Sequence, residues 1–123
     1  MTQKEKKLLL KDLCARMPYG VILNCCKTVN ETLTLIDYKG LVNNDYDIDE
    51  VKPYLFPMSS MTEEQKEEFN TRSLELQLKV LDDEITYEKA TEFEVDFYNK
   101  HHLDWRGLIP MGLAIDATGL NIY

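Results

Sequence analysis

The sequence predicts an α+β fold, in which an N-terminal helix and a small antiparallel β-meander are followed by a mainly helical C-terminal part. Three observations predict it: a helix-capping pattern at Thr2, two short apolar runs after the first helix, and an apolar stripe at helical spacing near the C-terminus. The chain has 123 residues, of which 44% are hydrophobic. We therefore expect a single domain, residues 1–123, with the sheet in residues 1–58 and mainly helices in residues 59–123.

The first helix is expected over residues 3–16. Thr2 and Glu5 have the spacing of a capping box, in which each side chain accepts a hydrogen bond from the backbone amide of the other residue. Pro18 then ends the helix. Its expected buried stripe recurs at steps of three and four residues and consists of Leu9, Leu10, Leu13, Cys14 and Met17.

Residues 21–26 and 32–38 are short, apolar or β-branched runs, and they predict two antiparallel strands joined by a polar turn over residues 27–31. Shorter strands near residues 41–42 and 48–51 would complete the meander, which we expect to form an SH3-like half-barrel. Residues 52–58 contain Pro53 and Pro57, and each proline removes a backbone donor from a strand. This segment is therefore expected to be an extended connector and not a central strand.

Thr62 caps a second helix, with Gln65 at the reciprocal position of a capping box. Residues 74–80 alternate apolar and polar side chains, which predicts a half-buried strand, although the same leucines also fit one face of a longer helix. We favour the strand and keep the helix as the alternative. The final helix is expected over residues 88–102, with Ala90, Phe93 and Phe97 on one face.

The net charge of −8 is unevenly distributed along the chain. Residues 1–42 contain seven basic and four acidic side chains, whereas residues 43–123 contain seven basic and eighteen acidic ones. A chain this acidic is not expected to bind nucleic acid directly, because phosphate binding needs a basic surface. No apolar run approaches the roughly 20 residues that cross a bilayer, and no signal peptide is visible, so we expect a cytoplasmic protein that does not bind membranes.

The sequence predicts no cofactor and no metal site. Its three cysteines, Cys14, Cys25 and Cys26, lack the spacing of a zinc site or a disulfide framework, and we interpret them as reduced thiols of the core. The acidic residues 43–50 begin like a calcium-binding loop. Counted from Asp45, however, Glu50 occupies the position that requires glycine, so an EF-hand is excluded.

Residues 99–113, which we call the C-terminal signature, contain both histidines and the only tryptophan. The candidate binding residues are His101, Asp104, Trp105 and Arg106, because tryptophan and arginine are common in binding hot spots. The same residue types also anchor domain cores, and we favour packing because Leu103, Leu108 and Ile109 flank them. No nucleophile–base pair, P-loop or metalloprotease motif surrounds them, so no catalytic residue is predicted.

Three segments resemble, in the same order, a group of short proteins encoded by phages, prophages and chromosomes of Bacteroides-type gut bacteria. The segments are residues 8–21, 52–65 and 99–116, which together cover 46 of the 123 positions. In that group Phe and Tyr are more common at the positions of Leu103 and Trp105. The resemblance implies an origin on a mobile element and assigns no activity, cofactor or site residue.

We therefore expect a phage-derived accessory protein that binds another protein without catalysis. The first alternative is an acidic inhibitor, or DNA mimic, that occupies a basic DNA-binding surface. The second alternative is a small enzyme that uses the region of His101.

Overall fold

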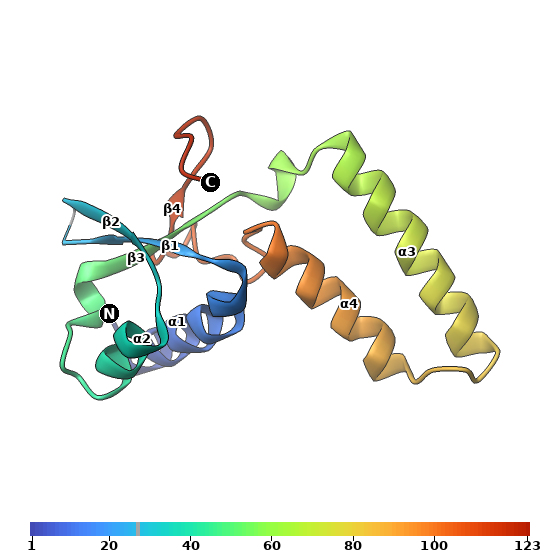
Figure 1. Ribbon diagram of the computed structural model, residues 1–123, viewed down its shortest axis with the longest axis horizontal. Helices are drawn as coiled ribbons and strands as arrows, with labels where there is room; N and C mark the ends of the chain where they lie inside the picture. Colours follow the sequence, from blue (N-terminus) through green and yellow to red (C-terminus); the bar gives the residue numbers. More distant parts are fainter. Residues whose placement is uncertain (27) are drawn as a thin grey trace.

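A computed structural model describes residues 1–26 and 28–123 of the chain, and it confirms the α+β class (Figure 1). Short 3₁₀ turns (η) join some of the elements. In chain order the elements are α1 (Gln3–Arg16), η1 (Met17–Tyr19), β1 (Ile22–Cys25), β2 (Val29–Thr32), α2 (Leu35–Val42), η2 (Ile48–Glu50), β3 (Val51–Leu55), η3 (Met58–Ser60), α3 (Glu63–Leu81), α4 (Tyr87–Lys100) and β4 (Ile115–Asp116).

The first helix has the predicted bounds, and both hydrogen bonds of the predicted capping box at Thr2 and Glu5 are present. Its buried face differs from the prediction. Leu9 and Leu13 are fully buried, but so are Asp12 and Arg16, whereas Cys14 is exposed. The side of α1 that faces the rest of the molecule therefore carries an acid and a base as well as leucines.

The sheet has the strand order β2-β1-β3-β4. β1 pairs antiparallel with β2 and with β3, and β3 pairs parallel with β4. This mixed sheet does not confirm the SH3-like half-barrel. α1 and α2 lie side by side on one side of the sheet (Figure 1).

The second predicted strand, over residues 32–38, is wrong. The strand that pairs with β1 is instead β2, which lies earlier, at Val29–Thr32. Lys27 of the predicted turn lies outside the described residues. Thr34 and Asp37 form a capping box that starts α2, so a local helix signal prevailed over the apolar run. The shorter strand expected at residues 41–42 is likewise part of α2.

The proline-containing connector is also partly wrong, because Pro53 belongs to β3, which has a strand on each side. Pro53 pairs with Leu23 of β1, and the pairing of β3 with β4 begins only at Tyr54. Proline has no backbone N–H to donate to a neighbouring strand. Pro53 is tolerated because no residue of β4 pairs with it.

The strand predicted over residues 74–80 is wrong, because α3 continues without interruption from Glu63 to Leu81. Thr62 provides the predicted capping box with Gln65, and leucine, glutamate, glutamine and lysine are strong helix formers. Here intrinsic propensity outweighs the alternating pattern.

The final helix is α4, two residues shorter at its C-terminal end than predicted. α3 and α4 contact each other and project to one side of the sheet; we call residues 62–100 the helical hairpin and the remaining residues the sheet region (Figure 1). Residues 101–123 return to the sheet and contribute Leu108, Leu113 and Ala114 to the main hydrophobic core. No helix of the described residues is long and apolar enough to cross a membrane.

Candidate functional site

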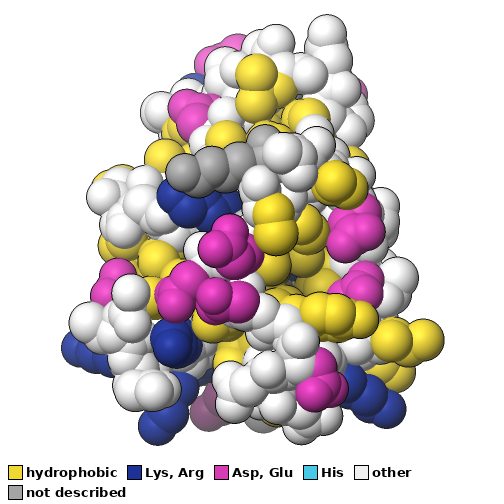
Figure 2. All heavy atoms as spheres, turned by 90° about the vertical axis from the view of Figure 1, so that its left-hand side faces the viewer, with side chains coloured by type: hydrophobic (Ala, Val, Ile, Leu, Met, Phe, Trp, Pro, Cys, Tyr) yellow, Lys and Arg dark blue, Asp and Glu magenta, His cyan; other side chains and the backbone are white. Residues whose placement is uncertain are grey.

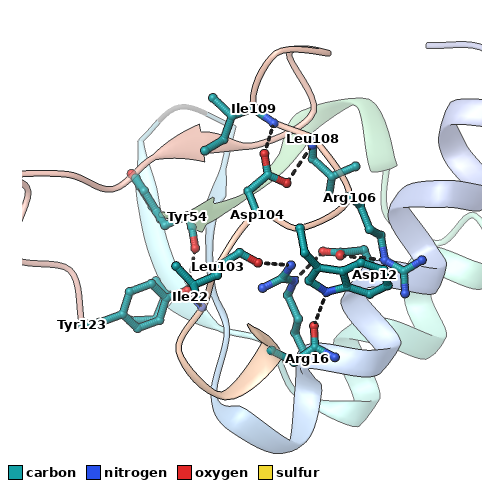
Figure 3. A network of polar contacts seen from close by, with 12 residues as sticks. Asp12, Arg16, Ile22, Tyr54, Leu103, Asp104, Arg106, Leu108, Ile109 and Tyr123 are labelled. Atoms are coloured by element: carbon teal, nitrogen blue, oxygen red, sulfur yellow. Dashed lines mark hydrogen bonds and ion pairs between the residues drawn. The ribbon is translucent and has the colours of Figure 1, made fainter. Parts of the chain in front are cut away.

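Asp104 of the C-terminal signature is buried and acts as a local anchor. Its two carboxylate oxygens accept hydrogen bonds from the backbone amides of Leu108, at 2.7 Å, and Ile109, at 2.9 Å (Figure 3). Its own amide donates to the carbonyl of Phe56, beside β3. Both oxygens thus satisfy backbone donors of the loop that follows, which is a structural role.

Arg106 reaches a polar network that the sequence did not reveal. Its Nε donates to Asp12 Oδ1 at 3.1 Å, and Arg16 Nε donates to Asp12 Oδ2 at 2.8 Å. Arg16 Nη2 also donates to the Leu103 carbonyl at 2.6 Å (Figure 3). One buried carboxylate on α1 therefore holds two guanidinium groups, one of them from the C-terminal signature. The only sequence signal was the spacing of four residues between Asp12 and Arg16.

Trp105 is half-buried and is held on two sides. Its indole Nε1 donates to Asn99 Oδ1 at 2.9 Å, and the Arg106 guanidinium lies 4.1 Å from the centre of a tryptophan ring. A cation over an indole face is an attractive contact. Trp105 and Arg106 are thus brought together at the junction of α4 with α1, where their polar groups have partners within the chain.

His101 lies apart from this network, at the end of α4. Its ring centre is 4.5 Å from that of Phe97, and its Nδ1 is 3.3 Å from Gln65 Nε2. The side-chain oxygen Oε1 of Gln65 accepts a hydrogen bond from the backbone amide of Thr62. The side-chain nitrogen of Gln65 is therefore the group that faces the histidine. Because that nitrogen can only donate, Nδ1 accepts and Nε2 carries the proton.

Burial lowers the pKa of His101, so the ring is neutral at pH 7. It lines a cavity of about 260 Å³ together with polar side chains of Ser60, Thr62, Gln65 and Thr118. The buried Nε2 has no hydrogen-bond partner among the described residues. No carboxylate or thiol lines this cavity to serve as a base or nucleophile beside the imidazole.

His102 and Tyr123 form a separate aromatic contact. Their rings are stacked, with centres 3.6 Å apart and planes inclined by 11°. Burial, with a smaller contribution from the Arg16 charge, lowers the pKa of His102 to about 4. The Tyr123 hydroxyl donates to the Tyr54 carbonyl at 2.8 Å and accepts from the Ile22 amide at 2.9 Å, so it bridges β1 and β3 (Figure 3).

The structure therefore places the four predicted site residues in two different surroundings. Asp104, Trp105 and Arg106 form internal contacts, whereas His101 faces a separate small cavity. Across residues 1–26 and 28–123, no group of three or more His, Cys, Asp or Glu side chains is arranged to hold a metal ion. The prediction that all three cysteines are core thiols is wrong for Cys14 and Cys26, which are exposed.

Exposed apolar side chains also lie on the helical hairpin. Phe69, Phe93, Phe97 and Tyr98 pack against one another where the hairpin joins the sheet region, with ring centres 5.3–5.8 Å from that of Phe69. Towards the free end this packing stops, and a groove of about 310 Å³ opens between the helices. Its apolar lining consists of Leu76, Val80, Leu81, Tyr87 and Ala90.

The amino-acid sequence matches no protein-family model, and neither curated proteins nor solved structures show a significant similarity to this chain or to its fold.

Proposed function

We propose that the protein is a cytoplasmic accessory protein of a mobile element and binds another protein, without catalysis, through the free end of the helical hairpin. The observation that carries the proposal is an uncovered apolar stripe on the hairpin. Leu81 is 78% exposed and Tyr87 is 74% exposed, and Leu74 and Leu78 are each more than half exposed. Leu74, Leu78 and Leu81 recur at steps of four and three residues and share one helix face.

The stripe is uncovered because the hairpin buries little of its apolar surface. Of the nineteen residues of α3, all of them described, only Leu76 is buried. Large contiguous apolar patches are rare on monomeric proteins and often mark binding sites. The groove between the helices continues this surface, and together they suit an amphipathic helix laid into a groove.

Charge indicates which amphipathic helix would fit. The helical hairpin carries twelve acidic and five basic side chains, whereas the rest of the chain carries ten acidic and nine basic ones. Nearly all of the net negative charge thus lies on the helical hairpin. The expected partner is a protein that presents an apolar stripe flanked by lysine and arginine, because opposite charges favour the encounter and the correct orientation.

The proposal is tested by recovering partners from the native host with two tagged variants. One variant carries Leu74→Ser, Leu78→Ser and Leu81→Ser. The matched control carries Leu35→Ser and Ile36→Ser, which replace exposed apolar residues of α2. We expect a partner that copurifies with the wild type and the control to be lost with the triple variant, at unchanged melting temperature. A partner lost equally with both variants would contradict a role of the hairpin.

The acidic inhibitor is the second candidate, favoured by a row of carboxylates on α3. Glu64, Glu67, Glu68 and Glu75 line one shallow depression with Thr71 and Arg72. If these carboxylates occupy a basic DNA-binding surface of the partner, Glu64→Gln with Glu67→Gln should release the partner. Duplex DNA should then compete with this protein for that surface. The leucine variant would then retain the partner, which would contradict the apolar contact proposed above.

A further inference from the structure

A cavity of about 510 Å³ is lined by elements at the end of the molecule opposite the helical hairpin. It opens between the β1–β2 pair, α2 and the turn before β3. Its floor is formed by Leu23, Leu41 and Val51, which are buried members of the main core. Figure 2 shows the apolar hollow with acidic side chains at its edge. This volume lies within the range of small-molecule sites.

Five carboxylates lie around the opening, namely those of Glu31, Asp37, Asp45, Asp47 and Glu50. None of the ion pairs among the described residues uses any of them. Burial and the adjacent Glu31 carboxylate raise the pKa of Cys25 to about 11, so the thiol that faces the cavity stays neutral. The described lining of the cavity therefore combines an apolar floor with five carboxylates.

Tyr46 provides an aromatic wall at the same opening. One edge of its ring, at Cδ2 and Cε2, lies against Gly40 of α2, and a Cβ at position 40 would overlap it. The glycine thus leaves room for the tyrosine, which lines the cavity. Aromatic faces attract organic cations.

The carboxylates do not form a metal site, because no three of them in the described residues are close enough to share one ion. Separated negative groups around an apolar floor fit an elongated ligand with several positive charges and an aliphatic body. We propose that this cavity binds a linear aliphatic polyamine, whose methylene chain lies on Leu23, Leu41 and Val51 and whose ammonium groups pair with the surrounding carboxylates. The proposal is independent of the partner assigned to the helical hairpin.

The test is a titration of the full chain with spermidine, in which calorimetry and amide chemical shifts measure the binding. We expect saturable binding, with shifts concentrated in residues 23–26, 31, 37–41 and 45–51. Asp45→Asn combined with Glu50→Gln should lower the affinity for spermidine about tenfold, since two partly exposed ion pairs are lost. These two side chains are chosen because Asp37 and Asp47 cap α2 and η2, and Glu31 accepts a hydrogen bond from Cys25.

The matched control is Glu64→Gln with Glu67→Gln, which removes the same charge from α3 and should leave the affinity within about twofold. Tyr46→Leu should lower the affinity for spermidine about threefold, in keeping with the attraction of an exposed cation to an aromatic face. Equal weakening by the control, or equal shifts with Mg²⁺, would overturn the proposal in favour of non-specific charge attraction. Tight binding of a trilysine peptide without binding of spermidine would also overturn it, in favour of a polypeptide ligand.

Discussion

The sheet region and the helical hairpin differ in how many of their apolar side chains they bury. In the sheet region, leucines and valines from α1, β1, β3 and residues 108–114 form one buried core, and acidic and basic side chains are nearly equal in number. In the helical hairpin, only Leu76 and Phe97 of the large apolar side chains are buried, and acidic residues are in excess. One region therefore contains the main hydrophobic core, while the other buries few apolar side chains.

The largest effect is expected from Asp12 in the sheet region. Asp12→Ala removes the acceptor of both Arg16 and Arg106 and should cost about 3–5 kcal/mol of unfolding free energy, because a buried guanidinium loses its counter-charge. Urea denaturation measures this loss. Glu75→Ala, which removes an exposed ion pair with Arg72 on the hairpin, is the control and should change stability by less than about 0.5 kcal/mol. Equal effects of the two variants would end the contrast between the regions.

Trp105 lies where the two regions meet, and its truncation should have an intermediate effect. Trp105→Ala removes a half-buried indole, its hydrogen bond to Asn99 and its contact with Arg106. We expect a loss of about 2–3 kcal/mol, below the usual cost of emptying a fully buried aromatic site. Equilibrium denaturation distinguishes this from a binding role, in which stability would change by less than about 0.5 kcal/mol while a partner is lost.

His102 should make the sheet region sensitive to acid. Its folded pKa of about 4 lies below the ordinary value of 6.5, so the unfolded chain binds a proton more readily than the folded one. Stability from this group is present above pH 6.5 and is lost as the pH falls towards 4. The expected loss is on the order of 1 kcal/mol, since solvent screens the half-buried ring.

The measurement for His102 compares the pH dependence of urea denaturation in the wild type and in His102→Asn. Asparagine is a suitable replacement because His102 has a φ of 58°, a conformation that asparagine tolerates. The variant should lose less stability than the wild type between pH 7 and pH 4. Identical profiles would show that the stacked histidine does not contribute to the acid sensitivity.

The smallest effect is expected on the helical hairpin. Leu81→Ser should change stability by less than about 0.5 kcal/mol, because the leucine is already 78% exposed. Thermal unfolding of the isolated protein tests this, and Leu76→Ser, at a buried position of the same helix, should destabilise it by more than 2 kcal/mol, roughly the usual cost of a core truncation. Comparable losses would mean that Leu81 is covered in solution.

Local signals predicted the helices well and the strands poorly. The capping boxes at Thr2 and Thr62 located the starts of α1 and α3, because capping depends on residues three apart in the sequence. Thr34 and Asp37 form a capping box with the same spacing, but the apolar run around them was interpreted as a strand, which is wrong. The two residues of β4 have no recognisable pattern, since their pairing depends on β3, about sixty residues earlier.

The candidate site shows the same limit. The sequence pointed to residues 101–106 but could not show that Asp104 and Arg106 are engaged within the protein, because their partners Leu108, Ile109 and Asp12 are defined only by the fold. The alternation over residues 74–80 was interpreted as half-burial in a sheet. In the structure these leucines lie on a helix, and most of them are exposed.

The Tyr123 hydroxyl also has a consequence for how the chain folds. In the register of β1 and β3, Ile22 would be the next residue to face Tyr54, and the hydroxyl joins their amide and carbonyl where the strands separate. Forming this link closes a loop of 101 residues. Closing so long a loop costs chain entropy, so the contact is expected to form late in folding. Tyr123→Phe should therefore speed unfolding and leave the folding rate almost unchanged, as expected for a contact that forms after the main barrier.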